Sequence, residues 1–172
     1  MRTLSILALF IFVGSAHADE CDAMTSRVIA ASPGTAFKAR LDRSVQLAHP
    51  DAIRLYFMCP PDPDVRASSV HPNPPPSYFQ MVGHAGSVIA GVSAEKVRRA
   101  AIACHQAALR ETPSTGGSRF ADIIQDGVYV NCVTSQKEGT YIIVNSPDSA
   151  ALFDKYGCLS KSNCPALDRP SR

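Results

Sequence analysis

Cys104 and His105 are neighbours in the stretch AIACHQAALR, and a thiol beside an imidazole is a possible nucleophile with its base. The apolar residues of this stretch recur with helical spacing, and adjacent side chains on a helix point about 100° apart. The two groups therefore lack the geometry of a catalytic dyad. Cys104 shares the apolar face of the expected helix with Val97, so we expect a structural role for it.

The other residues that could do chemistry are scattered along the chain. His49, His71 and His105 show no HExxH or other helical ligand spacing, and Asp62 and Asp64 lack the further ligands of an EF-hand loop. A fold could still gather these five residues into one polar site, which is the basis of a hydrolase hypothesis. The spacing itself assigns no catalytic residue, no metal ligand and no cofactor.

The cysteines favour disulfides over reactive thiols. In an exported chain an even number of cysteines is first interpreted as a disulfide set, and six cysteines allow fifteen pairings. Cys104 on a helix face and Cys132 on an apolar strand face are expected to pair in the core. The remaining pairs would be Cys21 with Cys59, which tethers the N-terminal region, and Cys158 with Cys164, which closes a short polar tail.

The N-terminal segment MRTLSILALFIFVGSAHA predicts export. It combines a basic residue at Arg2, an apolar run over 4–13 and an A-x-A arrangement ending at Ala18, which is the pattern of a signal peptide. The apolar run is too short to span a bilayer. We therefore expect residues 1–18 to be removed near Ala18, leaving a periplasmic or secreted protein without a membrane span.

The charge balance limits the class of partner. Lys and Arg total 17 against 15 acidic residues, a formal net charge of +2, and cleavage of the signal peptide would remove Arg2. Nucleic acids and anionic membranes are bound through concentrated positive charge, so neither is expected as the main partner. The expected partner is an unidentified protein or small-molecule ligand.

The elements that must position these residues follow from hydrophobic periodicity and from Gly and Pro placement. Gly83 and Gly86 weaken one helix by about 1 kcal/mol each relative to alanine, or they permit close helix packing. The expected elements, in chain order, are a helix over 22–32, strands over 35–41, 44–47 and 51–59, a proline-rich surface loop over 60–76, helices over 77–91 and 94–110, a strand hairpin over 126–135 and 139–145, and a short helix over 146–157.

This order does not alternate strictly between strands and helices, so it does not predict a parallel, doubly wound sheet. It predicts a disulfide-stapled α+β fold, with an antiparallel sheet of about five strands and helices packed on one face. Residues 19–172 would form a single globular domain whose tail is closed by a disulfide over 158–164.

The stretches CDAM, LAHP, YFQMVGHAGSVIAG, CHQAAL and VYVNC are spread over residues 21–145. Through them the chain resembles small exported bacterial proteins of uncharacterised function. The resemblance implies a periplasmic or secreted setting and stable cysteine positions at 21, 59, 104 and 132, with the 158–164 pair as a possible addition. It implies no activity and no ligand.

Together these observations favour a non-catalytic binding or interaction module of the cell envelope over an enzyme. The alternative is a hydrolase-type enzyme that uses one of the three histidines with a carboxylate, and it predicts that histidines distant in sequence converge in one cleft.

Overall fold

A computed structural model describes residues 16–147 of the chain. The three helices are α1 (Ala16–Ala31), α2 (Pro76–Ala90) and α3 (Ala94–Arg110). The strands are β1 (Ala36–Arg40), β2 (Ser44–His49), β3 (Ala52–Met58), β4 (Asp64–Ser69), β5 (Ser118–Gln125), β6 (Val128–Ser135) and β7 (Gly139–Asn145). The predicted disulfide between Cys158 and Cys164, most of the predicted signal peptide and most of the expected helix over 146–157 lie outside the described residues.

The strands form one sheet in the order β1-β2-β3-β4-β7-β6-β5, and every neighbouring pair is antiparallel. The predicted α+β class is thereby confirmed. The expected number of about five strands is wrong, because the described sheet has seven.

The two strands missing from the prediction are β4 and β5. Strand β4 lies inside the segment 60–76 that was expected to be a surface loop, because prolines flank Asp64–Ser69 on both sides although none interrupts it. Strand β5 has apolar residues on both faces, Phe120 and Ile124 on one and Ala121 and Ile123 on the other. It therefore lacks the alternation by which a strand with one wet face is recognised.

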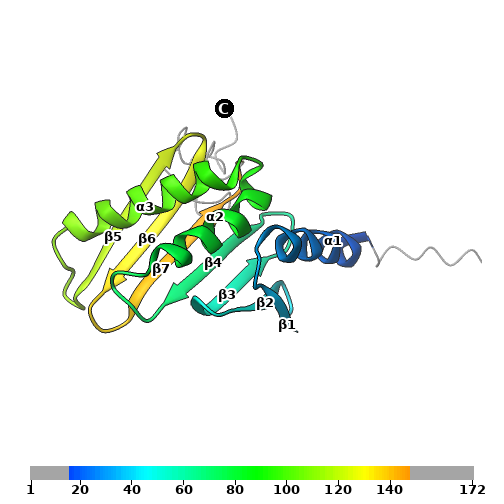
Figure 1. The fold of residues 1–172 in the computed structure, drawn as a ribbon, viewed down its shortest axis with the longest axis horizontal. Helices are drawn as coiled ribbons and strands as arrows, with labels where there is room; N and C mark the ends of the chain where they lie inside the picture. The colour runs from blue at the N-terminus through cyan, green and yellow to red at the C-terminus, as the bar shows by residue number, and fades with distance from the viewer. Residues whose placement is uncertain (1–15, 148–172) are drawn as a thin grey trace, which may run out of the picture.

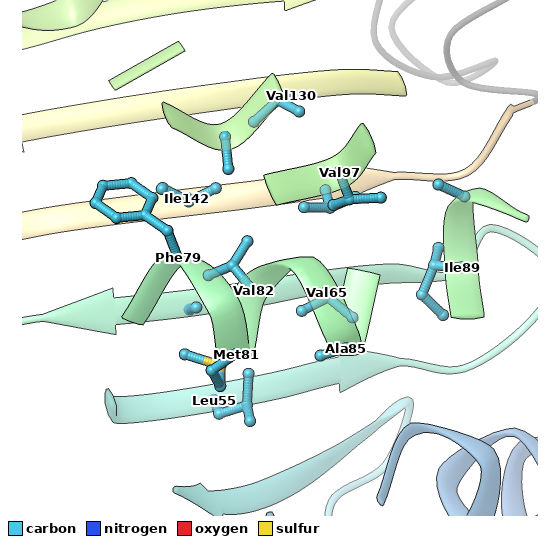
Figure 2. Packing of buried hydrophobic residues seen from close by; sticks show 14 of the residues in the cluster. Leu55, Val65, Phe79, Met81, Val82, Ala85, Ile89, Val97, Val130 and Ile142 are labelled. Atoms are coloured by element: carbon cyan, nitrogen blue, oxygen red, sulfur yellow. The ribbon is translucent and has the colours of Figure 1, made fainter. Parts of the chain in front are cut away.

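Helices α2 and α3 lie side by side across one face of the sheet, with α1 beside them near β1 to β3 (Figure 1). The core fills the space between these two layers. Figure 2 shows Val82 and Ala85 of α2 directed at the sheet, where Val65 and Ile142 are buried. Burial of this face supplies the main stabilisation expected for a two-layer fold.

Two glycines allow the helices and the sheet to approach closely. Close packing was one of the two interpretations of these glycines that the sequence left open. A Cβ atom at Gly83 would lie 2.7 Å from the Ala94 carbonyl oxygen, and one at Gly86 would lie 2.9 Å from Cγ1 of Val97. The same Cβ atom at Gly86 would lie 3.0 Å from Cγ1 of Val144 in β7. Gly86 therefore occupies the point where α2, α3 and the sheet meet.

Two of the three predicted disulfides are present among the described residues. Cys21 of α1 is bonded to Cys59 after β3, with 5.2 Å between their Cα atoms, and Cys104 of α3 is bonded to Cys132 of β6, with 5.9 Å. Both separations lie in the usual range for disulfides. The first bond ties α1 to the segment that follows β3, and the second ties α3 to β6, the neighbour of the edge strand β5. Cys104 is thus not a free nucleophile.

Candidate functional site

The five residues of the predicted polar site lie on different parts of the fold. His71 and Asp62 are exposed in the segments that flank β4, and Asp64 begins β4 on the face away from the helices. His105 is buried in α3, and His49 ends β2. Within residues 16–147 no group of three or more His, Cys, Asp or Glu residues is placed to hold a metal ion.

His49 has no free ring nitrogen. Its Nδ1 accepts a hydrogen bond from the backbone N–H of Asp51 at 3.1 Å, and its Nε2 lies 3.0 Å from the Pro33 carbonyl oxygen. A carbonyl can only accept, so these partners assign the proton to Nε2. The imidazole therefore fastens the end of α1 to the turn between β2 and β3, which accounts for it without catalysis.

His84 of α2 lines a hollow of about 250 Å³ together with His49. Ser32 and Ser77 also line this hollow, and the buried Oγ of Ser32 has no hydrogen-bond partner among the described residues. Two of the four histidines after Ala18 thus share a hollow. Because both nitrogens of His49 are occupied, His49 is not available as a base toward a serine of this hollow.

His105 is 5% exposed, and its ring lies 5.5 Å from that of Phe79 between α3 and α2. Burial lowers the pKa of this imidazole, and its Nδ1 has no hydrogen-bond partner among residues 16–147. A neutral histidine packed against an aromatic ring behaves as a core residue.

The opposite face of the sheet is the most distinctive surface. None of the described helices lies on it, since all three pack on the other side (Figure 1). We call it the open face. The strand register places its outward side chains in rows, of which one runs through Arg54, Ser68, Tyr141 and Val133 and the next through Tyr56, Arg66, Ile143 and Asn131.

Asp64 and Arg66 form a two-pronged ion pair on the open face. The Arg66 Nε donates to Oδ1 of Asp64 at 2.9 Å, and Nη2 donates to Oδ2 at 2.8 Å. Burial raises the pKa of the Asp64 carboxyl, and the hydrogen bonds and charge of Arg66 oppose that rise only in part. Arg66 also interacts with the Tyr141 hydroxyl, so it joins an acid and a phenol across the centre of the sheet.

A hollow of about 700 Å³ lies over this part of the open face. We call it the open-face hollow. Its lining includes two arginines, two tyrosines, a methionine and a glutamate, which are Arg54, Arg66, Tyr56, Tyr141, Met58 and Glu138. Arg54 is exposed and forms no hydrogen bond or ion pair with any described residue.

A polar network continues from the hollow toward β5. Asn145 donates to Oδ1 of Asn131 at 2.7 Å, and Asn131 donates to the Tyr129 hydroxyl at 2.7 Å and to Asp122. Burial raises the pKa of Tyr129 to about 12. These hydrogen bonds link polar side chains of β7, β6 and β5 across the open face.

The sequence pattern pointed to Asp64 but missed the tyrosines and arginines of the open-face hollow. The alternation in β3, with Leu55 and Phe57 turned to the core, already implied that Arg54 and Tyr56 face the other way. Arg66 could not be found in the same manner, because its strand was interpreted as a proline-rich loop.

No family model matches the chain, and no curated protein or solved structure shows significant similarity to it. No helix in the described part of the chain has the length and apolar character needed to cross a membrane.

Proposed function

We propose that this chain is an exported, disulfide-stabilised binding protein of the cell envelope, and that it binds a partner protein through the open face without catalysing a reaction. One observation carries the proposal. A whole face of a seven-stranded sheet is free of the described helices and presents tyrosine, arginine and methionine side chains around one hollow. The two disulfides agree with an oxidising compartment.

The residue types of the open-face hollow favour a protein partner. Tyr, Met and Arg are enriched in the buried centres of protein interfaces, and Tyr and Arg are frequent among the residues that dominate binding energy. Tyr56, Tyr141 and Arg66 are partly buried and rest on a sheet, so little side-chain freedom remains to be lost on binding. Sites for small molecules are instead concave and enclose most of the ligand.

The area of the open face also suits a protein partner. Seven strands spaced about 4.8 Å apart, each roughly seven residues long, span roughly 29 Å by 23 Å, or about 670 Å². A stable complex of standard size buries about 800 Å² on each partner. The open face together with its rim therefore approaches the size of a standard interface.

The charged residues of the open face indicate which groups the partner should carry at the interface. Arg66 is already paired with Asp64, whereas Arg54 has no acidic partner among residues 16–147. An arginine at an interface is best matched by a carboxylate, which it binds through two parallel hydrogen bonds. The partner should therefore place an Asp or Glu side chain over Arg54 and apolar groups against Tyr56 and Tyr141.

The test is affinity capture from periplasmic or culture extract with purified wild-type protein and with three variants. Tyr141→Ala and Arg54→Glu change the open face, and Lys96→Glu makes the same charge change on α3, where the side chain is exposed. We expect a protein that is retained by wild type and by Lys96→Glu but is lost with both open-face variants. Retention that is unaffected by the open-face variants, or the absence of any retained protein, would reject the proposal.

A further inference from the structure

A third hollow, of about 240 Å³, lies where β5 begins and β6 ends, and the loop that joins α3 to β5 lines part of it. We call it the β5–β6 hollow. Its polar lining includes two cations and a hydroxyl, from Arg119, Lys137 and Ser135, and no acidic residue lines it. It shares no lining residue with the open-face hollow. Its chemistry therefore has to be considered separately.

Arg119 lies in β5 opposite Thr134 of β6, and its guanidinium is incompletely satisfied. Its Nε is buried and has no hydrogen-bond acceptor among the described residues. A buried donor on a charged group costs free energy unless it finds an acceptor, so such groups are nearly always paired. The position of Arg119 in this hollow thus calls for an acceptor that residues 16–147 do not supply.

Two further donors line the same hollow. Ser135 is 6% exposed, and its Oγ accepts hydrogen bonds from the backbone N–H groups of Lys137 at 3.2 Å and Glu138 at 3.4 Å. These bonds use the lone pairs of the oxygen and leave the O–H proton to be donated. The Lys137 side chain is exposed and forms no ion pair with a described residue.

From these three donors we infer that the β5–β6 hollow binds an oxyanion group, a phosphate or a carboxylate of a small ligand. The guanidinium of Arg119 supplies its buried N–H to one oxygen, while Lys137 supplies charge and Ser135 donates its hydroxyl proton. Charge-assisted hydrogen bonds of this kind are shorter and stronger than neutral ones. The absence of a carboxylate from the lining leaves the positive charge available to the ligand.

The test is a nuclear magnetic resonance titration of the ¹⁵N-labelled protein with sodium phosphate and, separately, sodium acetate. Sodium chloride at equal ionic strength is the control. The Arg119 Nε–H resonance reports directly on the proposed hydrogen bond, and the amides of Ser135 and Lys137 report on the hollow. Lys137→Gln is the main variant, since it changes an exposed turn residue and should fold, with Arg119→Gln as the second and Lys96→Gln as the matched control on α3.

We expect saturable shifts of these resonances with phosphate or acetate but not with chloride. The apparent affinity should fall about tenfold or more in Lys137→Gln and in Arg119→Gln and stay unchanged in Lys96→Gln. Saturation by phosphate alone would identify a phosphate site, and saturation by acetate alone would identify a carboxylate site. Equal shifts with chloride, or equal losses in Lys96→Gln, would overturn the inference. Arg54→Ala should leave the titration unchanged, so the result does not depend on the function proposed for the open face.

Discussion

Asp64 is the more deeply buried partner of its ion pair with Arg66, with 13% of its side chain exposed against 39% for the arginine. The two residues should therefore respond differently to substitution. In Asp64→Asn the arginine can turn to solvent, whereas in Arg66→Gln a buried carboxylate loses its counter-charge. Leaving a buried charged group unpaired costs about 1 to 3 kcal/mol or more. We expect Arg66→Gln to lower the free energy of unfolding by about that much more than Asp64→Asn, as measured by urea unfolding at pH 7.

The stability deficit of Arg66→Gln should depend on pH. The folded-state pKa of Asp64 is raised by burial even with Arg66 present, and Arg66→Gln removes the groups that oppose the rise. A raised folded-state pKa means that protonation favours the folded state, so the deficit of Arg66→Gln should shrink as the pH falls through that pKa. The double variant Asp64→Asn/Arg66→Gln should show no such recovery. Equal deficits for the two single variants, independent of pH, would contradict the assignment.

His105 should make the fold sensitive to mild acid. Because burial lowers its folded-state pKa, the unfolded chain takes up the proton first, and stability falls as the pH drops below about 6.5, the ordinary pKa of histidine. One such group contributes at most about 1.4 kcal/mol for each pH unit. His105→Leu removes an unpaired buried nitrogen, so we expect it to match wild type at pH 7 and to unfold less readily at pH 5.

The matched control for His105 is His71→Gln, because His71 is exposed. Urea unfolding of the three proteins at pH 7, 6 and 5 measures the effect. A pH dependence that is identical in wild type and His105→Leu would show that other groups cause the acid sensitivity.

Gly86→Ala should destabilise the fold although alanine favours helices. The substitution gains about 1 kcal/mol in helix propensity. It also places a methyl group 2.9 Å from Val97 and 3.0 Å from Val144, and overpacking of this kind costs about 1 to 3 kcal/mol. We expect a lower melting temperature, and Val97→Ala in the same chain should restore part of the loss by making room. A variant as stable as wild type would mean that α2 and α3 can separate without cost.

The parts of the fold that could be predicted are those in which one periodicity dominates. Helix α3 follows from its apolar stripe through Val97 and Cys104, and the same stripe led to the disulfide with Cys132. Strand β5 was missed because Phe120 and Ile124 put apolar side chains on its open face, where β3 has Arg54 and Tyr56. Periodicity reports which side chains a strand buries, and it fails where both faces are apolar.

The candidate site was less predictable than the fold, because it depends on which strands are neighbours. Tyr141 and Arg54 are far apart in the chain, and they share a row only because β4 pairs with β7 instead of with the next strand in the sequence. The sequence offered no motif for that pairing. The histidines could be named as candidates from the sequence, but the structure gives two of them structural roles. His49 is hydrogen-bonded to Pro33 and Asp51, and His105 is buried against Phe79.

Signal-peptide cleavage and disulfide formation both change the intact mass of the protein. The intact mass of the exported protein, measured without reductant and after treatment with a thiol-alkylating reagent, should correspond to a chain that begins at Asp19. The four described cysteines should remain unmodified, because each is bonded to another. A mass that includes residues 1–18 would contradict cleavage near Ala18, and alkylation of Cys104 would contradict its bond to Cys132.

The double variant Cys104→Ala/Cys132→Ala tests how much this disulfide contributes to the stability of the fold. A disulfide that links residues 28 positions apart restricts the unfolded chain and should contribute about 3.5 kcal/mol, and the two buried sulfur atoms would leave unfilled space as well. Cys21→Ala/Cys59→Ala opens a link of 38 positions with a similar entropic effect, but it releases α1 from the segment that follows β3. We therefore expect the first variant to lose amide hydrogen-exchange protection throughout β6 and α3, and the second to lose it mainly in α1. Equal, uniform loss of protection in both variants would indicate that α1 unfolds only together with the sheet.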